Sequence, residues 1–276
     1  MPLLNEDTIS IHYEQTGEGP DVVWVCGGGG LPEWTWCRWQ IPEFPRYRHT
    51  VFHNRGIGET TCDEPGPWTI ADFARDTALV IERTCAGPAI VVGKSMGAMI
   101  TTQLALDRPE LVALAVPMGT AGKSYGWIHD YMRAEIEFRK QGGSLSGLFA
   151  VCHYAATLNP ADELGDLDSW NALKDQYAPF GAVGDNANER SLELQWDACD
   201  TFDCLDQLPA CTVPLHVVGF GQDVQAPPRY AREVAELAPT GVFHLLPEHG
   251  HASLWGPMRS GEVNDLLREI FSGHDG

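Results

Sequence analysis

A serine in the pattern glycine-x-serine-x-glycine is typical of a nucleophile that attacks an acyl carbon, and this chain contains the pattern twice. Ser95 lies in "GKSMG" and Ser124 lies in "GKSYG". The chemistry needs a sharp turn from a strand into a helix, with small neighbours that let the backbone tighten. Ser95 fits on both sides, because it follows "PAIVVG" and precedes "MGAMITTQLAL". Ser124 lies further from the preceding apolar run and close to the bulky Trp127, so we interpret it as a loop or helix-capping serine.

A serine hydroxyl needs an adjacent base, and the base needs an acid that orients it. On a parallel sheet these partners follow the serine in the order acid, then histidine. Asp223 follows the apolar run "LHVVGF", and His251 lies in "EHGHASLWGP" after the run "VFHLLP". We therefore predict Asp223 and His251 as the partners of Ser95, although Asp223 also suits a turn or a helix cap. His249 is the alternative histidine, and the alternative acids are Asp200, Asp203 and Asp206.

The same reaction needs two backbone N–H groups that stabilise the negative oxygen of the intermediate. Met96 directly follows the serine and supplies one from a helix N-terminus. We predict Gly28, in the glycine run 27–30, as the second donor, because glycine lets the backbone approach a substrate closely. Which glycine of the run donates stays open. Neither the "GKS" sites nor this run matches a nucleotide-binding pattern, so we expect no cofactor.

Elements that could position these residues alternate along the chain. Apolar runs rich in β-branched residues are typical of buried strands, and segments of helical period separate them. This alternation predicts an α/β fold with a mainly parallel central sheet and helices on both faces. The predicted strands are 8–13, 22–26, 50–53, 89–92, 111–116, 215–220 and 242–246, and the predicted helices cover 71–84, 98–110, 229–239 and 261–271.

The alternation stops between residues 121 and 208, where helix-like segments carry many aromatic side chains. We predict a core domain of residues 1–120 and 209–276, with residues 121–208 as a helical cap over the carboxyl edge of the sheet. Aromatic residues at helical spacing usually pack a core, so only a few are expected to line a substrate pocket. The predicted substrate-binding residues are Trp127, Tyr131, Tyr154 and Trp196.

Composition limits the possible partners. The chain has 276 residues and a formal net charge of −20, which would repel nucleic acid and anionic membrane surfaces. No signal peptide or membrane span is visible, so a cytoplasmic protein is expected. The eight cysteines lack metal-binding spacing, and we expect reduced thiols and no metal site. The oligomeric state is left open.

Taken together, the motifs resemble those of the α/β-hydrolase superfamily, and within it the non-haem haloperoxidase-like and related esterase members. The segments that carry the resemblance are "VVWVCGGGG", "VFHNRGIGET", "VVGKSMGA", "VVGFGQDVQAPP" and "HGHASLWGP". The chain departs from the family at His53, where an aspartate is usual, at Cys26, where histidine is common, and at Lys94, before the nucleophile. We expect Lys94 to pair with a carboxylate at the strand end.

The resemblance implies a cofactor-independent serine hydrolase that cleaves an ester, lactone or related acyl bond of a small apolar substrate. Halide oxidation through a peracid would be a side activity of the same residues. The alternatives are a thioesterase, a lyase that breaks a carbon–carbon bond or eliminates a leaving group, and a non-catalytic ligand receptor on the same fold.

Overall fold

The computed structural model describes residues 2–182, 189–256 and 258–274, which fold around one nine-stranded sheet. The strand order is β1-β2-β4-β3-β6-β7-β8-β9, and β5 pairs with β2 outside this path. Strands β3, β4, β6, β7, β8 and β9 run parallel to one another, whereas β2 runs antiparallel to β1, β4 and β5. The strands are β1 (Leu3–Glu6), β2 (Ile9–Thr16), β3 (Asp21–Val25), β4 (Arg48–Phe52), β5 (Thr61–Cys62), β6 (Ala89–Lys94), β7 (Val112–Met118), β8 (Leu215–Phe220) and β9 (Gly241–Leu246).

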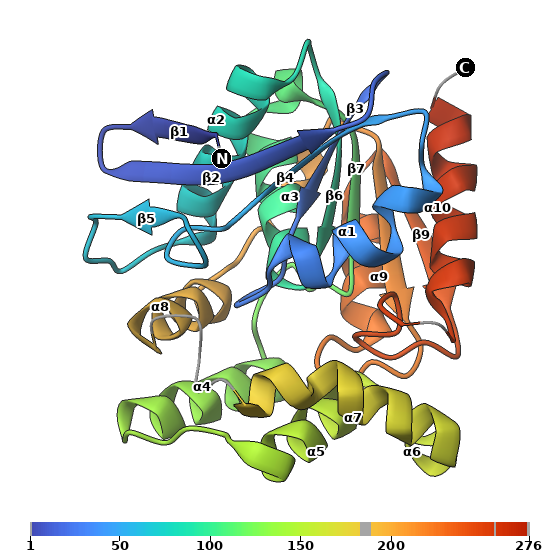
Figure 1. The fold of residues 1–276 in the computed structure, drawn as a ribbon. Coiled ribbons are helices and arrows are strands. Elements are labelled where there is room, and N and C mark those ends of the chain that lie inside the picture. Colours follow the sequence, from blue (N-terminus) through green and yellow to red (C-terminus); the bar gives the residue numbers. More distant parts are fainter. Residues whose placement is uncertain (1, 183–188, 257, 275–276) are drawn as a thin grey trace.

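Helices cover both faces of the sheet (Figure 1). On one face α2, α3 and α9 pack in the larger apolar cluster, and on the other face α1 and α10 pack in a second one. Every residue of β3 and of β6 is buried, as expected for strands covered on both sides. The helices are α1 (Trp36–Trp39), α2 (Ile70–Thr84), α3 (Met96–Asp107), α4 (Trp127–Lys140), α5 (Gly147–Leu158), α6 (Ala161–Gly165), α7 (Leu167–Ala182), α8 (Glu189–Asp200), α9 (Pro228–Leu237) and α10 (Ser260–His274).

The predicted α/β fold with a mainly parallel sheet is confirmed, and the predicted strands and helices are present with small shifts at their ends. The sequence analysis missed β1 and β5. Both are short and largely exposed strands at the antiparallel end of the sheet, where no buried face imposes an apolar pattern. None of the described helices is long and apolar enough to cross a membrane.

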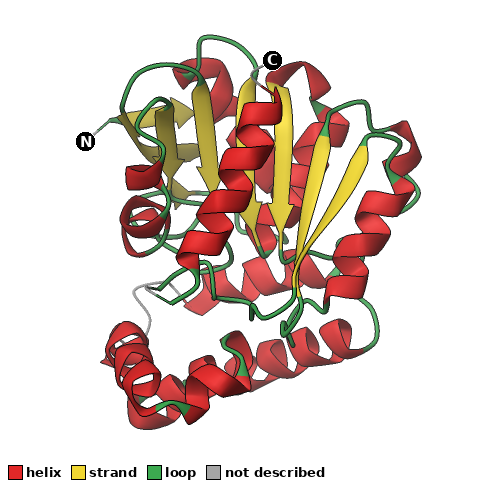
Figure 2. Cartoon of the chain, turned by 90° about the vertical axis from the view of Figure 1, so that its right-hand side faces the viewer, coloured by secondary structure: helices red, strands yellow, loops and turns green. Residues whose placement is uncertain are grey.

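Helices α4 to α7 form a layer beyond the carboxyl ends of the parallel strands, toward which the arrowheads point (Figure 2). Helices α5 and α7 share a small apolar cluster of their own. Helix α8 differs, because its Leu194, Ala198 and Cys199 belong to the larger cluster of the sheet. The division into a core and a cap at residues 121 and 208 stays a prediction, and α8 packs on the core side of that division.

Candidate active site

Ser95 occupies the tight turn between β6 and α3. Its backbone has φ 59° and ψ −122°, a positive φ that is uncommon for a residue with a side chain. The two flanking glycines make this turn possible. A Cβ atom on Gly93 would lie 2.1 Å from the carbonyl oxygen of Gly97, and one on Gly97 would lie 2.3 Å from that of Val25. The pattern predicted around Ser95 therefore has a steric cause, since no larger residue fits either flanking position.

The partners predicted for Ser95 lie beside it. His251 Nε2 is 3.0 Å from Ser95 Oγ, and His251 Nδ1 is 2.6 Å from Asp223 Oδ2. The other carboxylate oxygen of Asp223 accepts the backbone N–H groups of Gln225 and Ala226, each at 2.8 Å. Asp223 is thus the turn aspartate and the partner of the histidine at once. The structure brings together Ser95, His251 and Asp223 from three segments that are far apart in the sequence.

The alternative residues lie elsewhere. Ser124 Oγ donates to Asp200 Oδ1 at 3.1 Å, in the loop before α4. His249 is fully buried, stacks on Phe220 and has its Nε2 3.3 Å from the carbonyl oxygen of Arg259. Within the described part of the chain, neither Ser124 nor His249 forms a hydrogen bond with Ser95.

The surroundings of His251 keep it neutral. Burial lowers its pKa, the charge of Asp223 opposes this effect, and the nearby Lys94 ammonium adds to it. A neutral imidazole whose Nδ1 proton is held by Asp223 presents the lone pair of Nε2 to the serine hydroxyl. The arrangement is therefore suited to removing the Ser95 proton.

Met96 is the first residue of α3, so its N–H has no acceptor one turn earlier in the helix. Within the glycine run, Gly29 N–H donates to Gln195 Oε1 at 2.9 Å and Gly30 N–H donates to the carbonyl oxygen of Gly27 at 3.1 Å. Among the described residues, the N–H groups of Gly27 and Gly28 donate no hydrogen bond to the protein. The N–H of Gly28, which the sequence analysis predicted as the second oxyanion donor, therefore stays available, as does that of Gly27.

Helix α8 holds the glycine run in place, which the sequence analysis did not foresee. A Cβ atom on Gly28 would lie 1.9 Å from the ring of Trp196, so the indole packs directly on this glycine. The adjacent Gln195 is fully buried, accepts from Gly29 and donates to the carbonyl oxygen of Arg55 at 3.2 Å. No local motif marks a glutamine of this kind, because its partners lie far away in the chain.

Ser95 opens into a cavity of about 840 Å³. Of the predicted substrate-binding residues, Tyr131, Tyr154 and Trp196 line it. Trp127 does not belong to the lining: its side chain is 55% exposed at the start of α4, and its indole N–H donates to the carbonyl oxygen of Val224 at 2.6 Å. The structure thus places Trp127 outside the lining of this cavity, on the exposed side of the first turn of α4.

Glu135 is a further cavity residue that the sequence analysis missed. Its Oε2 accepts the indole N–H of Trp196 at 2.5 Å, and its Oε1 lies 3.4 Å from His153 Nε2 and from the Tyr131 hydroxyl. Burial alone would raise the pKa of Glu135, but the hydrogen bonds from His153 and Trp196 lower it overall. Glu135 is thus an ionised anchor for the ring that covers Gly28.

Lys94 does not form the expected ion pair. Its side chain is 3% exposed, and its Nζ lies 4.6 Å from the ring centre of Trp255, with no carboxylate in ion-pair contact among the described residues. Burial lowers the pKa of Lys94 to about 7, although the charge of Asp223 opposes the shift. Lys94 also lines the cavity. Asp223, whose charge acts on Lys94, does not form this ion pair, because its two oxygens are engaged by His251 and by the turn.

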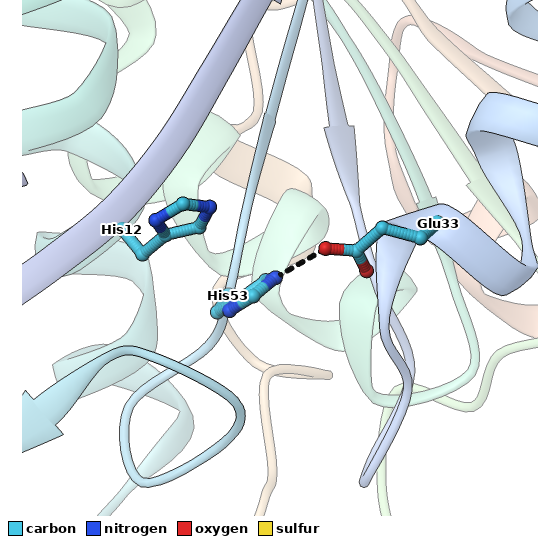
Figure 3. Close-up of side chains that lie close together, drawn as sticks. All are labelled: His12, Glu33 and His53. Carbon is cyan, nitrogen blue, oxygen red and sulfur yellow. Dashed lines mark hydrogen bonds and ion pairs between the residues drawn. The ribbon is translucent and has the colours of Figure 1, made fainter. Parts of the chain in front are cut away.

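A second cluster of ionisable side chains contains His12, Glu33 and His53 (Figure 3). Their nitrogen and oxygen atoms lie within 4.8 Å of one another, close enough to surround a metal ion. His53 Nδ1 accepts the N–H of Glu59 at 2.9 Å, so Nε2 carries the proton and donates to Glu33 Oε1 at 2.9 Å. A metal at Nε2 would need the opposite tautomer, so the observed arrangement is a hydrogen-bonded cluster and does not fit a ligand set.

Comparison with known proteins agrees with this geometry. The model of the Alpha/beta hydrolase family matches residues 22–266. A protein of Mycobacterium tuberculosis, named as a candidate non-heme bromoperoxidase, BpoC, is 32% identical over 272 residues, which cover 96% of this chain and 98% of the relative. Its crystal structure matches with a TM-score of 0.89 over 98% of both chains. Rhodomycin D methylesterase DnrP of Streptomyces peucetius is 26% identical and covers 91% of each chain.

The fold and the family match together define the class of protein. The chain belongs to the alpha/beta hydrolase family and is an enzyme of that family. Its similarity to BpoC confirms the predicted resemblance to the haloperoxidase-like branch.

Proposed function

We propose that this protein is a serine hydrolase that cleaves an ester, lactone or related acyl bond of a small substrate without a cofactor. The observation that carries the proposal is the continuous hydrogen-bonded chain from Ser95 through His251 to Asp223, which opens into a large cavity. The relative DnrP is named as a methylesterase, and methyl ester cleavage belongs to the same reaction class.

In the proposed mechanism Ser95 Oγ attacks the carbonyl carbon while His251 Nε2 accepts the hydroxyl proton. Asp223 holds the Nδ1 proton and stabilises the imidazolium. The N–H groups of Met96 and Gly28 donate to the oxyanion of the tetrahedral intermediate. His251 then protonates the leaving alcohol, an acyl-enzyme remains, and a water molecule activated by the same histidine releases the acid.

We further propose that residues 121–208 act as a cap that shapes the substrate pocket. The support is that both parts of the chain line the cavity. Ser95 and Gly28 belong to the predicted core, and Tyr131, Tyr154 and Trp196 belong to residues 121–208. Aromatic rings on the cap side favour a substrate with an apolar body.

Three measurements test the proposed chemistry. A fluorophosphonate should label Ser95 covalently, as located by mass spectrometry, and Ser95→Ala should abolish turnover of simple esters while circular dichroism stays unchanged. Hydrolysis in heavy-oxygen water should place the label in the acid product, whereas elimination would not. Undiminished activity of Ser95→Ala, or no adduct on Ser95, would refute the proposal.

A further inference from the structure

The cavity wall beside Ser95 contains a buried lysine, Lys94, whose ammonium group has no partner of opposite charge among the described residues. An ammonium group carries three donors, and its burial is costly unless an acceptor or an anion meets it. Lys94 is only 3% exposed, yet its side chain makes neither a hydrogen bond nor an ion pair with any residue that the structure describes. Its Nζ lies over the ring of Trp255, a contact that compensates only part of the lost hydration.

A second donor without a partner lies in the same wall. The indole Nε1 of Trp255 is buried and has no hydrogen-bond acceptor in the described part of the chain. Trp255 and Lys94 both line the cavity. Lys94 Nζ lies over the ring of Trp255, and a cationic donor without an acceptor in a cavity wall favours a ligand that brings acceptor oxygens of its own.

The carboxylates of Asp223, Glu33 and Glu135 already accept hydrogen bonds from other groups of the protein. Both oxygens of Asp223 are engaged, one with His251 and one with the N–H groups of the turn. Across the cavity, Glu33 accepts from His53 and Glu135 accepts from Trp196. Desolvation lowers the pKa of Lys94 to about 7, and a bound anion would offset this and keep the ammonium charged. The missing partner of Lys94 is therefore expected on the substrate.

We propose that Lys94 and Trp255 form a carboxylate-binding subsite next to the nucleophile, so that the preferred substrates are esters or lactones that also carry a free carboxylate. This inference rests on the proposed function, because it names the substrate class of the Ser95 site. An ammonium–carboxylate contact shielded from water gives strong discrimination against a neutral group of the same shape.

Turnover is tested with matched pairs of esters. The monomethyl esters of succinic, glutaric and adipic acid are each compared with the neutral ester in which an amide replaces the free carboxylate. The wild-type enzyme should favour the acid over its amide by about tenfold or more in kcat/KM for at least one chain length. In Lys94→Met this ratio should fall to about one.

The matched control is Lys174→Met. Lys174 also stacks on a tryptophan, with its Nζ 6.0 Å from the ring centre of Trp170, but it lies outside the cavity lining. The acid-to-amide ratio should stay at the wild-type value in this variant. A ratio that falls in both variants, or a Lys94→Met enzyme that keeps its preference for the acids, would overturn the subsite.

Binding without turnover separates the two proposals. Calorimetry should show that glutarate binds to Ser95→Ala at least tenfold more tightly than to Ser95→Ala combined with Lys94→Met. If this difference appears while the wild type hydrolyses none of the esters, the subsite stands and the proposed hydrolysis fails. If the esters are hydrolysed through Ser95 without any preference for the acids, the hydrolysis stands and the subsite fails.

Discussion

The protonation of His251 is influenced by the carboxylate of Asp223 and by the ammonium group of Lys94, and the proposed activation of Ser95 depends on it. Burial lowers the pKa of His251 below its usual value of 6.5, with Asp223 opposing and Lys94 adding to the shift. The imidazole must be neutral to accept the serine proton, so activity is lost as the pH falls through this lowered pKa. We predict that the acid limb of kcat/KM lies below pH 6.5 for a neutral ester, as measured by a pH–rate profile.

Lys94→Met provides the internal comparison for this prediction. Removing a positive charge near His251 makes the imidazolium easier to form, so the acid limb should move to higher pH. Lys174→Met, distant from the site, should leave the limb in place. A limb above pH 6.5 in the wild type, or one that Lys94→Met moves downward, would contradict the electrostatic account.

Asp223 performs two tasks with its two oxygens, and Asp223→Asn separates them. The amide oxygen can still accept from Gln225 and Ala226, so the turn is retained. The amide NH₂ now faces His251 Nδ1 as a donor, which forces the proton onto Nε2 and removes the base. We predict a loss of kcat of about 10³- to 10⁴-fold, measured on a simple ester, with little change in melting temperature. Asp223→Ala should lose both activity and stability, and near-wild-type activity in Asp223→Asn would refute the assigned role.

The reactive residues were predictable from the sequence because each carries a local signal. Ser95 has glycines that the turn requires, and Asp223 and His251 each follow an apolar run that ends at the edge of the sheet. Lys94 has no such signal, since its environment is made by Trp255, which lies in a distant loop. The position of Trp127 outside the cavity lining could not be foreseen, because helical spacing alone does not tell which face of α4 meets the cavity.

At the level of elements, α8 contacts the glycine run 27–30, the loop from which we propose that the second oxyanion donor comes. Gln195→Leu would leave the N–H of Gly29 and the carbonyl of Arg55 without their buried partner. The glycine run would then be less well positioned for the developing oxyanion, although the substrate cavity remains. We predict that kcat falls about tenfold or more while KM changes little, as measured by steady-state kinetics.

The control for Gln195→Leu is Gln141→Leu, which alters an exposed glutamine after α4. Its kinetic constants should equal those of the wild type. An effect of Gln195→Leu on KM alone would mean that α8 shapes substrate binding and does not position the oxyanion loop.

The elements themselves were predictable where burial imposes a pattern. The continuous apolar runs of β3 and β6 reflect helices on both faces, and the chain from Ile70 to Thr84 has the helical period together with a capping box formed by Thr69 and Asp72. The role of α8 was not predictable, because its buried Leu194 and Gln195 meet partners on the sheet side that no local pattern reveals.

At the scale of the whole molecule, apolar burial is uneven. The larger cluster joins the sheet to α2, α3, α9 and part of α8, whereas α5 and α7 depend on the small cluster of Val151, Ala155, Leu173 and Tyr177. Segments with few buried contacts open locally at a lower free energy than the core. We predict that amides of α5 and α7 exchange with solvent deuterium much faster than those of β6, while α8 follows the core, as measured by hydrogen exchange with mass spectrometry.

A pair of cavity-forming variants makes this division testable in both directions. Leu194→Ala removes packing from the larger cluster, so it should lower the free energy of global unfolding by about 2–5 kcal/mol and weaken protection throughout the sheet. Val151→Ala removes packing only from the small cluster, so it should speed exchange in α5 and α7 and leave β6 unchanged. If Val151→Ala weakens β6 as much as Leu194→Ala does, residues 121–208 and the sheet unfold as one unit. The cap would then be an extension of the core, and the boundary at residue 121 would have no energetic meaning.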